Sequence, residues 1–294
     1  MSLPVAAVIV NYNARRHLEA LLASLRGEDL AGVVVVDNGS LDGSRVAVEE
    51  AGATWLASGT NLGYGRAANL GARQPAASGA EFLLVCNPDL VVGAGAVRTL
   101  YETMQSCEQA AIVGPRIDNV DGTLYPSARR FPDLVDAAGH GALGMLAPRN
   151  RFTRRYRMLD WDHAGISAVD WVSGACFLAR RRAWDQVGGF DPAFFMYMED
   201  VDLCWRLGRA GWQILYQPAA SVMHTQGVSA DRRPYRMLAE HHRSMWRFAL
   251  RTTSGPRRAA LPLVGAGLAG RFAATALRRR LAGTNPGVSS GPLP

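Results

Sequence analysis

The sequence predicts an α/β protein with a mostly parallel central sheet flanked by helices. Residues 5–10, 33–36 and 82–86 are uninterrupted apolar runs of strand length, the pattern of strands that are covered on both faces. The first two runs are each followed by a polar turn and a helical pattern, an alternation typical of parallel sheets. The length of 294 residues and the 48% share of hydrophobic residues suit a globular protein with one large core or two small ones.

The first strand, turn and helix open the chain. Residues 5–10 precede the polar turn Asn11-Tyr12-Asn13, and the next segment repeats leucine on one helical face. The four leucines are Leu18, Leu21, Leu22 and Leu25.

Two further strands end in acids. Residues 33–36 lead into Asp37-Asn38-Gly39-Ser40, before a helix that begins near Asp42, and residues 82–86 lead into Asn87-Pro88-Asp89-Leu90. Ligands of such sheets bind at the carboxyl ends of the strands. Asp37 therefore stands where an acid accepts a hydrogen bond from a base N–H or a ribose hydroxyl, and Gly39 lets a backbone come close. Between these strands, Asn61-Leu62-Gly63-Tyr64-Gly65-Arg66 is a turn into a helix that can present backbone N–H groups or Arg66 to phosphate.

An acidic cluster lies within residues 194–206. Glu199, Asp200 and Asp202 stand among aromatic and methionine residues. Desolvation and a neighbouring like charge both raise a carboxyl pKa, so the cluster can supply a base that takes a proton from a hydroxyl. The alternative is a helix N-terminus, with Asp200 and Asp202 in the first turn of a helix that runs to about Ala210.

These motifs together resemble those of the family 2 inverting glycosyltransferases, which have the GT-A fold. The resemblance spans about residues 4–230 and rests on Asp37-Asn38-Gly39-Ser40, Asn61-Leu62-Gly63-Tyr64-Gly65, Asn87-Pro88-Asp89, Gly188-Gly189-Phe190-Asp191 and Met198-Glu199-Asp200-Val201-Asp202-Leu203. Within the family, the chain is most similar to actinobacterial rhamnosyltransferases that act on polyprenyl-diphospho-N-acetylglucosamine. That similarity rests on Tyr125-Pro126-Ser127-Ala128-Arg129, Pro148-Arg149-Asn150, Trp171-Val172-Ser173-Gly174-Ala175-Cys176, Phe195-Met196-Tyr197-Met198-Glu199-Asp200 and Glu240-His241-His242-Arg243-Ser244.

The resemblance implies a site for a nucleotide-sugar donor and a metal ion. Asp37 would hold the base or ribose, and Asn11 would line the base pocket. Asp89 would be the remaining carboxylate of the family's Asp-X-Asp metal element, whose first position here is Asn87. Mg²⁺ keeps several waters and therefore needs few oxygen ligands from the protein, whereas a ligand at His224 would suit Mn²⁺ better. The alternative is that His224 is only hydrogen-bonded. The donor-binding set is Asn11, Asp37, Asn38, Gly39, Asn61, Gly63, Arg66, Asn87 and Asp89.

The same resemblance implies an in-line displacement at the anomeric carbon. Asp200 would be the base that deprotonates the acceptor, Glu199 would orient the acceptor, and Asp202 would cap the helix. A strand over residues 171–178 carries Ser173-Gly174-Ala175, which are small enough for a sugar to approach the backbone. The acceptor-binding set is Trp171, Ser173, Gly174 and Glu199.

The implied reaction moves L-rhamnose from dTDP-rhamnose to N-acetylglucosamine on a polyprenyl diphosphate, in synthesis of the cell-wall arabinogalactan linker. Two alternatives stay open: a family 2 transferase with another donor or acceptor, as in exopolysaccharide or O-antigen assembly, and a non-catalytic protein that binds sugar nucleotides. Basic residues between residues 118 and 170, Arg129 and Arg130 among them, are accompanied by aromatic residues. They suit an acceptor diphosphate, although a solvated loop has the same composition.

The chain divides by composition into three parts. Residues 1–230 are expected to be the GT-A domain, with a nucleotide-sugar half (1–115) and an acceptor and catalytic half (116–230). Residues 231–282 are expected to form a basic helical extension, with a helix from Tyr235 to about Arg251, and the Gly, Ser and Pro content predicts a disordered tail at residues 283–294. The four cysteines lack the paired spacing of a zinc site.

The extension is strongly basic. From Arg232 onward there are twelve arginines and one acid, Glu240, within a net charge of +7 for the chain. Residues 259–277 are apolar but interrupted by Pro262 and Arg271, and they fall short of the roughly 20 residues that a membrane span needs. They suit a helix lying on an anionic leaflet; the alternative is packing against the domain or in a homodimer. Nucleic acid is not expected as a partner, because the arginines lack interleaved aromatic residues.

The expected location is the cytoplasm, with peripheral attachment to the inner face of the cell membrane. Residues 5–10 are too short for a secretory signal and have no basic leader.

Overall fold

Ten strands form the main sheet of the computed structural model, which describes residues 2–131, 147, 150–156, 158, 160–225 and 234–281. In sheet order the strands are β3 (Thr54–Ala57), β2 (Leu30–Asp37), β1 (Leu3–Asn11), β4 (Phe82–Cys86), β11 (Cys176–Arg180), β6 (Ala110–Asn119), β12 (Gln213–His224) and β5 (Leu90–Val92), with β7 (Leu124–Tyr125) beside β6 and β9 (Ser167–Val169) beside β12. A separate pair consists of β8 (Ala128–Arg129) and β10 (Trp171–Val172).

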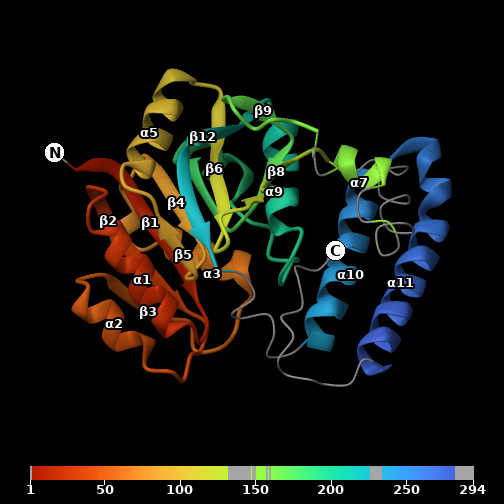
Figure 1. Ribbon diagram of the computed structural model, residues 1–294, viewed down its shortest axis with the longest axis horizontal. Coiled ribbons are helices and arrows are strands. Elements are labelled where there is room, and N and C mark those ends of the chain that lie inside the picture. Colours follow the sequence, from red (N-terminus) through yellow and green to blue (C-terminus); the bar gives the residue numbers. More distant parts are fainter. Residues whose placement is uncertain are drawn as a thin grey trace.

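Helices cover both faces of this sheet (Figure 1). One face packs against α1 (Arg15–Leu25), α2 (Ser44–Glu50) and α5 (Ala96–Ser106), and the other against α3 (Tyr64–Ala72), α4 (Pro75–Ser78), α8 (Arg181–Val187) and α9 (Glu199–Arg209). Successive residues of β1 point to opposite faces, and both sets are buried, which explains its uninterrupted apolar sequence. The four leucines predicted to form the inner face of α1 are all buried.

The prediction of a mostly parallel sheet holds for the first half of the chain. Strands β3, β2, β1 and β4 are parallel, whereas β11 runs antiparallel to both β4 and β6. The prediction of one strand over residues 171–178 was wrong. Residues Trp171–Val172 pair with β8, and the N–H of Ser173 donates to the oxygen of Ser127 (2.7 Å) beside this pair. The chain enters the main sheet only at Cys176.

The C-terminal extension forms α10 (Pro234–Thr252), a 3-10 helix η1 (Gly255–Ala260) and α11 (Leu261–Leu281). A helix over most of α10 was predicted. Figure 1 shows α10 and α11 as a pair at one end of the molecule. Contrary to the expected shortfall, residues 255–280 are long and apolar enough to cross a membrane, judged by length and composition alone, and none of their most apolar window is buried. The tail at residues 283–294 lies outside the described residues, as does most of the basic segment around Arg149. The remaining short helix, α7 (Arg151–Tyr156), belongs to that segment.

Candidate active site

The acidic pair stands at the start of α9, as the helix N-terminus reading expected, while the role of Asp200 as a base stays a prediction. Glu199 and Asp200 begin the helix, which ends at Arg209 as expected. The two residues before them, Tyr197 and Met198, have positive φ angles of 65° and 63°. Such backbone is costly for residues other than glycine and persists where surrounding contacts hold it, which is common at functional sites.

Asp200 is held by backbone N–H groups. Its Oδ2 accepts from Gly174 (2.8 Å) and its Oδ1 from Val201 (2.9 Å). A Cβ added to Gly174 would lie 3.1 Å from the Asp200 Cβ. The small residue expected to admit a sugar at this point therefore admits the side chain of Asp200.

The two carboxyl groups have different surroundings. Burial raises the pKa of Asp200, but the two N–H groups and the charge of Arg129 lower it. Glu199 is 7% exposed, and within the described residues its Oε2 has no hydrogen-bond partner. Burial, and then the charge of Asp200, raises the pKa of Glu199 to about 8. The pKa of Asp200 is raised overall by its burial, and the pKa of about 8 favours the protonated form of Glu199 at neutral pH.

Arg129 is the cation whose charge lowers the pKa of Asp200. Its guanidinium lies 5.0 Å from the ring centroid of Trp171 and 5.6 Å from that of Tyr125, and its Nε donates to the Pro126 oxygen (2.7 Å). The sequence showed a basic stretch accompanied by aromatic residues, but the contacts with Trp171 and Tyr125 that single out Arg129 depend on the fold.

Asp202 does not cap α9 as expected. The residue at the N-cap is Met198, and Asp202 is fully buried, where it accepts hydrogen bonds from Arg206 (2.7 Å) and from Arg251 of α10. A buried carboxylate needs such cationic partners.

The predicted nucleotide loop is organised around Asp37. Its Oδ1 accepts from the Asn11 amide (3.0 Å) and the Ser40 hydroxyl, and its Oδ2 from the N–H groups of Gly39 (3.1 Å) and Ser40 (2.9 Å). These bonds occupy the acceptor sites of the carboxylate, so Asp37 shapes the loop. Buried Asn11 Oδ1 has no partner in the described part of the chain. The contact of either residue with a base or ribose stays a prediction. The bond between Ser40 and Asp37 was not predicted, although Asp, Asn, Gly and Ser in succession are a turn signal.

Asn38 joins this loop to the glycine turn. Its amide donates to the oxygen of Gly63 and accepts from the N–H of Leu62, both at 3.3 Å. Asn61 Oδ1 accepts from the N–H of Gly63 (3.0 Å). Gly63 has φ +84°, and a Cβ there would lie 2.2 Å from the oxygen of Phe195. The donor-side turn therefore touches the loop that precedes Glu199.

Arg66, predicted to bind phosphate, is exposed. Its Nε donates to the oxygen of Pro192 (2.8 Å), which leaves its other guanidinium nitrogens for a ligand.

Asp89 and His224 meet as the metal prediction requires. Asp89 Oδ1 lies 3.1 Å from His224 Nε2, and both residues are buried at strand ends. Two ligands on adjacent octahedral positions with bonds of ~2.1 Å are about 3 Å apart, so the pair suits one divalent ion. It equally suits a direct hydrogen bond. Asn87 is half-buried, and its N–H donates to the oxygen of Ala175. Within the described ranges no three His, Cys, Asp or Glu residues gather into a metal cluster, so donor phosphates and water would complete the shell.

Of the predicted acceptor residues, Gly174 contacts Asp200 and Glu199 precedes it in α9. Trp171 is 5% exposed, and its Nε1 donates to the oxygen of Arg130 (2.9 Å). Ser173 is half-buried, and its hydroxyl accepts from the N–H of Ala175 (3.3 Å). Trp171 therefore supports Arg129 by packing, while direct contact of either residue with an acceptor stays a prediction.

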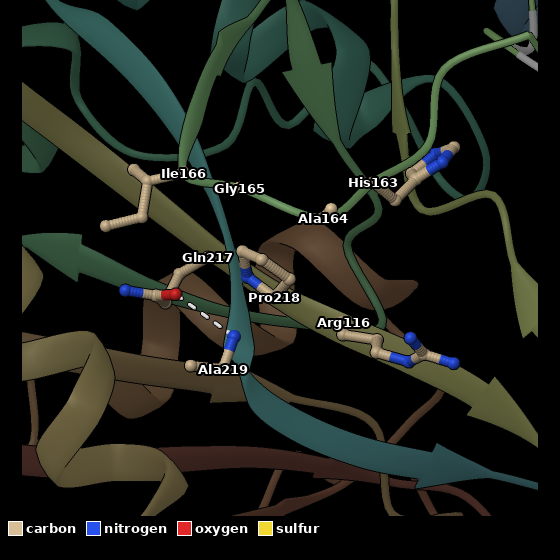
Figure 2. Close-up of a pocket in the computed structure, with 8 residues that line it drawn as sticks. All are labelled: Arg116, His163, Ala164, Gly165, Ile166, Gln217, Pro218 and Ala219. Carbon is tan, nitrogen blue, oxygen red and sulfur yellow. Dashed lines mark hydrogen bonds between the residues drawn. The ribbon is translucent and has the colours of Figure 1, made fainter.

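A surface cavity of about 470 Å³ lies elsewhere, beside the irregular part of β12 (Figure 2). It is lined by Arg116, His163, Ala164, Gly165, Ile166, Gln217, Pro218 and Ala219. None of these belongs to the predicted site, and Gln217 uses its side-chain oxygen on the N–H of Ala219 (3.0 Å). The lining of this cavity therefore offers no alternative to the predicted site with Asp89, Glu199 and Asp200.

Comparison with known proteins agrees with this arrangement. A family model described as glycosyltransferase like family 2 matches residues 3–247. The chain is 41% identical to the N-acetylglucosaminyl-diphospho-decaprenol L-rhamnosyltransferase of Mycobacterium tuberculosis (strain H37Rv), over 88% of this chain and 87% of the relative. It is 28% identical to the rhamnosyltransferase WbbL of Escherichia coli K12, over 75% and 83% of the two chains.

A solved structure shows the same fold. The mannosyltransferase PcManGT from Pyrobaculum calidifontis, in complex with GDP-Man and Mn²⁺, superposes with a TM-score of 0.55 at 17% identity, over 97% of this chain and 77% of that one. The predicted GT-A fold is thereby confirmed. Because the family model covers most of the chain and the mycobacterial relative is similar over nearly its whole length, the chain belongs to glycosyltransferase family 2, a family of inverting sugar transferases.

Proposed function

We propose that the chain transfers L-rhamnose from dTDP-rhamnose to a hydroxyl of N-acetylglucosamine on a polyprenyl diphosphate, with inversion at the anomeric carbon. The observation that carries this proposal is the 41% identity to the mycobacterial rhamnosyltransferase across 88% of this chain. The product would serve the linkage between peptidoglycan and arabinogalactan.

Asp200 is the base in this proposal. It takes the proton from the acceptor hydroxyl while that oxygen attacks the anomeric carbon opposite the departing nucleoside diphosphate. The Gly174 N–H and the charge of Arg129 favour the ionised form of Asp200. Glu199 keeps its proton and donates a hydrogen bond that orients the acceptor, as expected for a buried carboxyl group of raised pKa.

The donor side is formed by the loops around Asp37 and Gly63. The buried, unpartnered Oδ1 of Asn11 supports a role in holding the base, and the spare nitrogens of Arg66 support a role in holding phosphate. Asp89 and His224 are the residues that would hold Mg²⁺ or Mn²⁺. Such an ion would offset negative charge on the nucleoside diphosphate.

The protein acts in the cytoplasm, attached peripherally to the inner face of the membrane that carries its acceptor. Support comes from α11, whose apolar surface is exposed between Arg257-Arg258 and Arg278-Arg279-Arg280. Because cations at both ends favour the cytoplasmic side, the helix lies in the leaflet plane and does not cross it. A homodimer through α11 is the competing arrangement.

The test is detection of product by mass spectrometry. The purified chain is mixed with Mg²⁺ or Mn²⁺, a short-chain polyprenyl-diphospho-N-acetylglucosamine, and dTDP-rhamnose beside UDP-glucose, UDP-galactose and GDP-mannose. A deoxyhexose should be added only from dTDP-rhamnose. Asp200→Asn should abolish turnover and keep nucleotide binding, while Asp185→Asn, on the exposed side of α8, should leave both unchanged.

Transfer from another donor would contradict the rhamnose assignment and keep the mechanism. Absence of transfer from every donor, despite nucleotide binding, would contradict the assigned acceptor and favour the non-catalytic alternative.

A further inference from the structure

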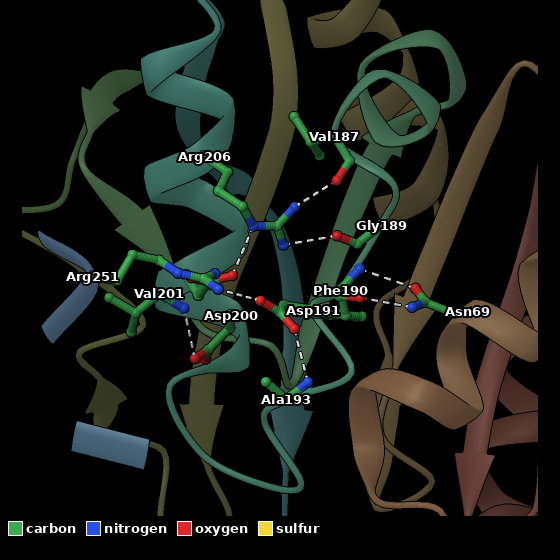
Figure 3. Close-up of polar contacts among 11 residues, drawn as sticks. Asn69, Val187, Gly189, Phe190, Asp191, Ala193, Asp200, Val201, Arg206 and Arg251 are labelled. Atoms are coloured by element: carbon green, nitrogen blue, oxygen red, sulfur yellow. Dashed lines mark hydrogen bonds and ion pairs between the residues drawn. The ribbon is translucent and has the colours of Figure 1, made fainter. Parts of the chain in front are cut away.

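The segment from Phe190 to Met198, here called the catalytic loop, lies between two helices that are distant in sequence. On one side, α3 holds it: the N–H of Tyr64 donates to the oxygen of Phe195 (3.0 Å), and Asn69 exchanges hydrogen bonds with the backbone of Phe190 (Figure 3). The loop then delivers Glu199 and Asp200 at its end.

On the other side, the C-terminal helix α10 holds the same loop. The Ser244 hydroxyl donates to the oxygen of Met196 (3.0 Å), and Arg247 donates to the oxygen of Ala193. These contacts join residues about 50 positions apart, so they exist only because the extension folds back onto the catalytic domain.

Arg251, also on α10, contacts two carboxylates at once. One guanidinium nitrogen donates to Asp191, at the start of the catalytic loop (Figure 3). Another donates to Asp202, in the first turn of α9. Asp202 is fully buried and also bonds to Arg206, whose other nitrogens donate to the oxygens of Val187 and Gly189, both at 2.7 Å. Arg251 thus ties the beginning of the loop to the helix that follows it.

The loop needs such a tie because its end is strained. Tyr197 and Met198 have left-handed backbone angles, and such a conformation persists only when neighbouring contacts over-determine it. A shift of about 1 Å in a reacting group is enough to cost ~100-fold in rate.

We propose that Arg251 is a positioning residue, which sets the catalytic loop and the first turn of α9 so that Asp200 faces the acceptor. It acts through Asp191 and Asp202 and does not touch substrate. The inference rests on the proposed role of Asp200 as base. It also makes the C-terminal extension part of the catalytic machinery.

Arginine suits this place better than lysine. Its planar fork reaches two carboxylates at once, whereas a single ammonium serves them less well. Arg251→Lys should therefore retain more activity than Arg251→Gln, which removes both contacts.

The test compares Arg251→Gln, Arg251→Lys and a matched control, Arg243→Gln, on the same helix; Arg243 is 71% exposed and pairs with Glu240. For Arg251→Gln, kcat should fall about 10- to 100-fold with little change in KM for the donor. The acidic limb of its kcat/KM–pH profile should also move, because Asp200 loses its fixed hydrogen bonds. Arg251→Lys should be intermediate and Arg243→Gln should match the wild type.

A second measurement needs no substrate and so stands apart from the donor and acceptor assignments. Amide hydrogen exchange across residues 190–202 should quicken in Arg251→Gln and in Asp191→Asn, which leaves the buried Asp202–Arg206 pair intact. Unchanged exchange there in both variants would overturn the proposal. So would a folded Arg251→Gln enzyme with lower thermal stability but wild-type kcat and pH profile, since that is the result of a purely structural role.

Discussion

At the residue scale, the adjacent carboxyl groups Glu199 and Asp200 differ by their hydrogen bonds. Asp200 accepts two backbone N–H bonds, while Glu199 Oε2 is buried with no partner among the residues described. Donors favour a carboxylate and burial favours a carboxylic acid. Two carboxyl groups that are neighbours in sequence therefore have different surroundings, and the pKa of Glu199 is raised to about 8.

This difference predicts the effect of pH on Glu199→Gln. The pKa of Glu199 is about 8 in the folded chain against an ordinary 4.5, so the folded state binds its proton more tightly than the unfolded state does. The resulting stability is fully present below about pH 4.5 and is lost as the pH rises through 8. Glu199→Gln does not undergo this loss. Raising the pH from 5 to 8 should therefore increase its unfolding free energy relative to the wild type by on the order of a few kcal/mol. Urea unfolding of the wild type, Glu199→Gln and the exposed control Glu49→Gln at pH 5 and pH 8 measures this difference. An equal change in unfolding free energy between the two pH values in all three proteins would contradict the prediction.

The Asp89–His224 pair predicts different metal requirements for two variants. Asp89→Asn should abolish metal-dependent activity, because the only carboxylate of the pair is lost. His224→Gln should raise the Mn²⁺ concentration for half-maximal activity about tenfold, a loss of ~1.4 kcal/mol in binding, and should affect Mg²⁺ less. Metal titrations of turnover measure both. If His224→Gln has the wild-type metal profile, His224 only hydrogen-bonds Asp89.

At the element scale, the contact between the glycine turn and the catalytic loop connects the donor and acceptor sides. Gly63 is the closest point, because Phe195 occupies the space that any side chain there would need. The turn at residues 61–65 was recognised in the sequence as a possible phosphate element, but its role in supporting the catalytic loop follows from this packing.

Two glycine variants compare a positive-φ position in open space with one that carries this contact. Gly59 has φ +76° with nothing within 4 Å of an added Cβ, whereas at Gly63 the Cβ would meet the oxygen of Phe195 at 2.2 Å. Gly59→Ala should cost about 1–2 kcal/mol of stability and leave kcat unchanged. Gly63→Ala should cost more than that and also lower kcat, since the catalytic loop must move. Thermal unfolding and initial rates measure the pair; equal effects of the two variants would show that the contact is unimportant.

At the scale of the whole molecule, the helix pair α10 and α11 connects the catalytic domain to its surroundings. One side of the pair holds the catalytic loop through Ser244 and Arg251, while α11 exposes an apolar surface with arginines at both ends. A membrane bound by α11 would therefore lie close to the element that positions the catalytic loop.

Vesicle binding tests this arrangement. The triple variant Arg278→Gln, Arg279→Gln and Arg280→Gln should weaken binding to anionic vesicles by ~3 kcal/mol, about 100-fold, at ~1 kcal/mol for each arginine. Removal of three arginines from the catalytic domain, Arg45, Arg98 and Arg182, is the matched control and should change binding little. Sedimentation with anionic and neutral vesicles measures both. Equal binding by the two variants, or a concentration-dependent dimer without vesicle binding, would favour a second copy of the chain as the partner of α11.

The sequence by itself determined the α/β class, the strands at residues 5–10, 33–36 and 82–86, the helix after the acidic cluster and most of α10. These depend on local periodicity and on the polar residues that end each strand, and both are visible in a linear chain. The sequence also indicated the family, because the motifs at Asp37, Asp89 and Asp200 occur in a specific order. The strand expected over residues 171–178 failed because its first residues pair with β8, more than 40 residues away, while its last residues pair with β4 and β6.

Only the tertiary structure decided which groups act on one another. That Gly174 makes room for Asp200, that Asp37 accepts a hydrogen bond from Asn11, and that buried Asp202 needs Arg251 are consequences of long-range packing. Hydrogen bonding and desolvation depend on neighbours in space and not in sequence, so they set the protonation of Glu199 and Asp200 only once the chain has folded.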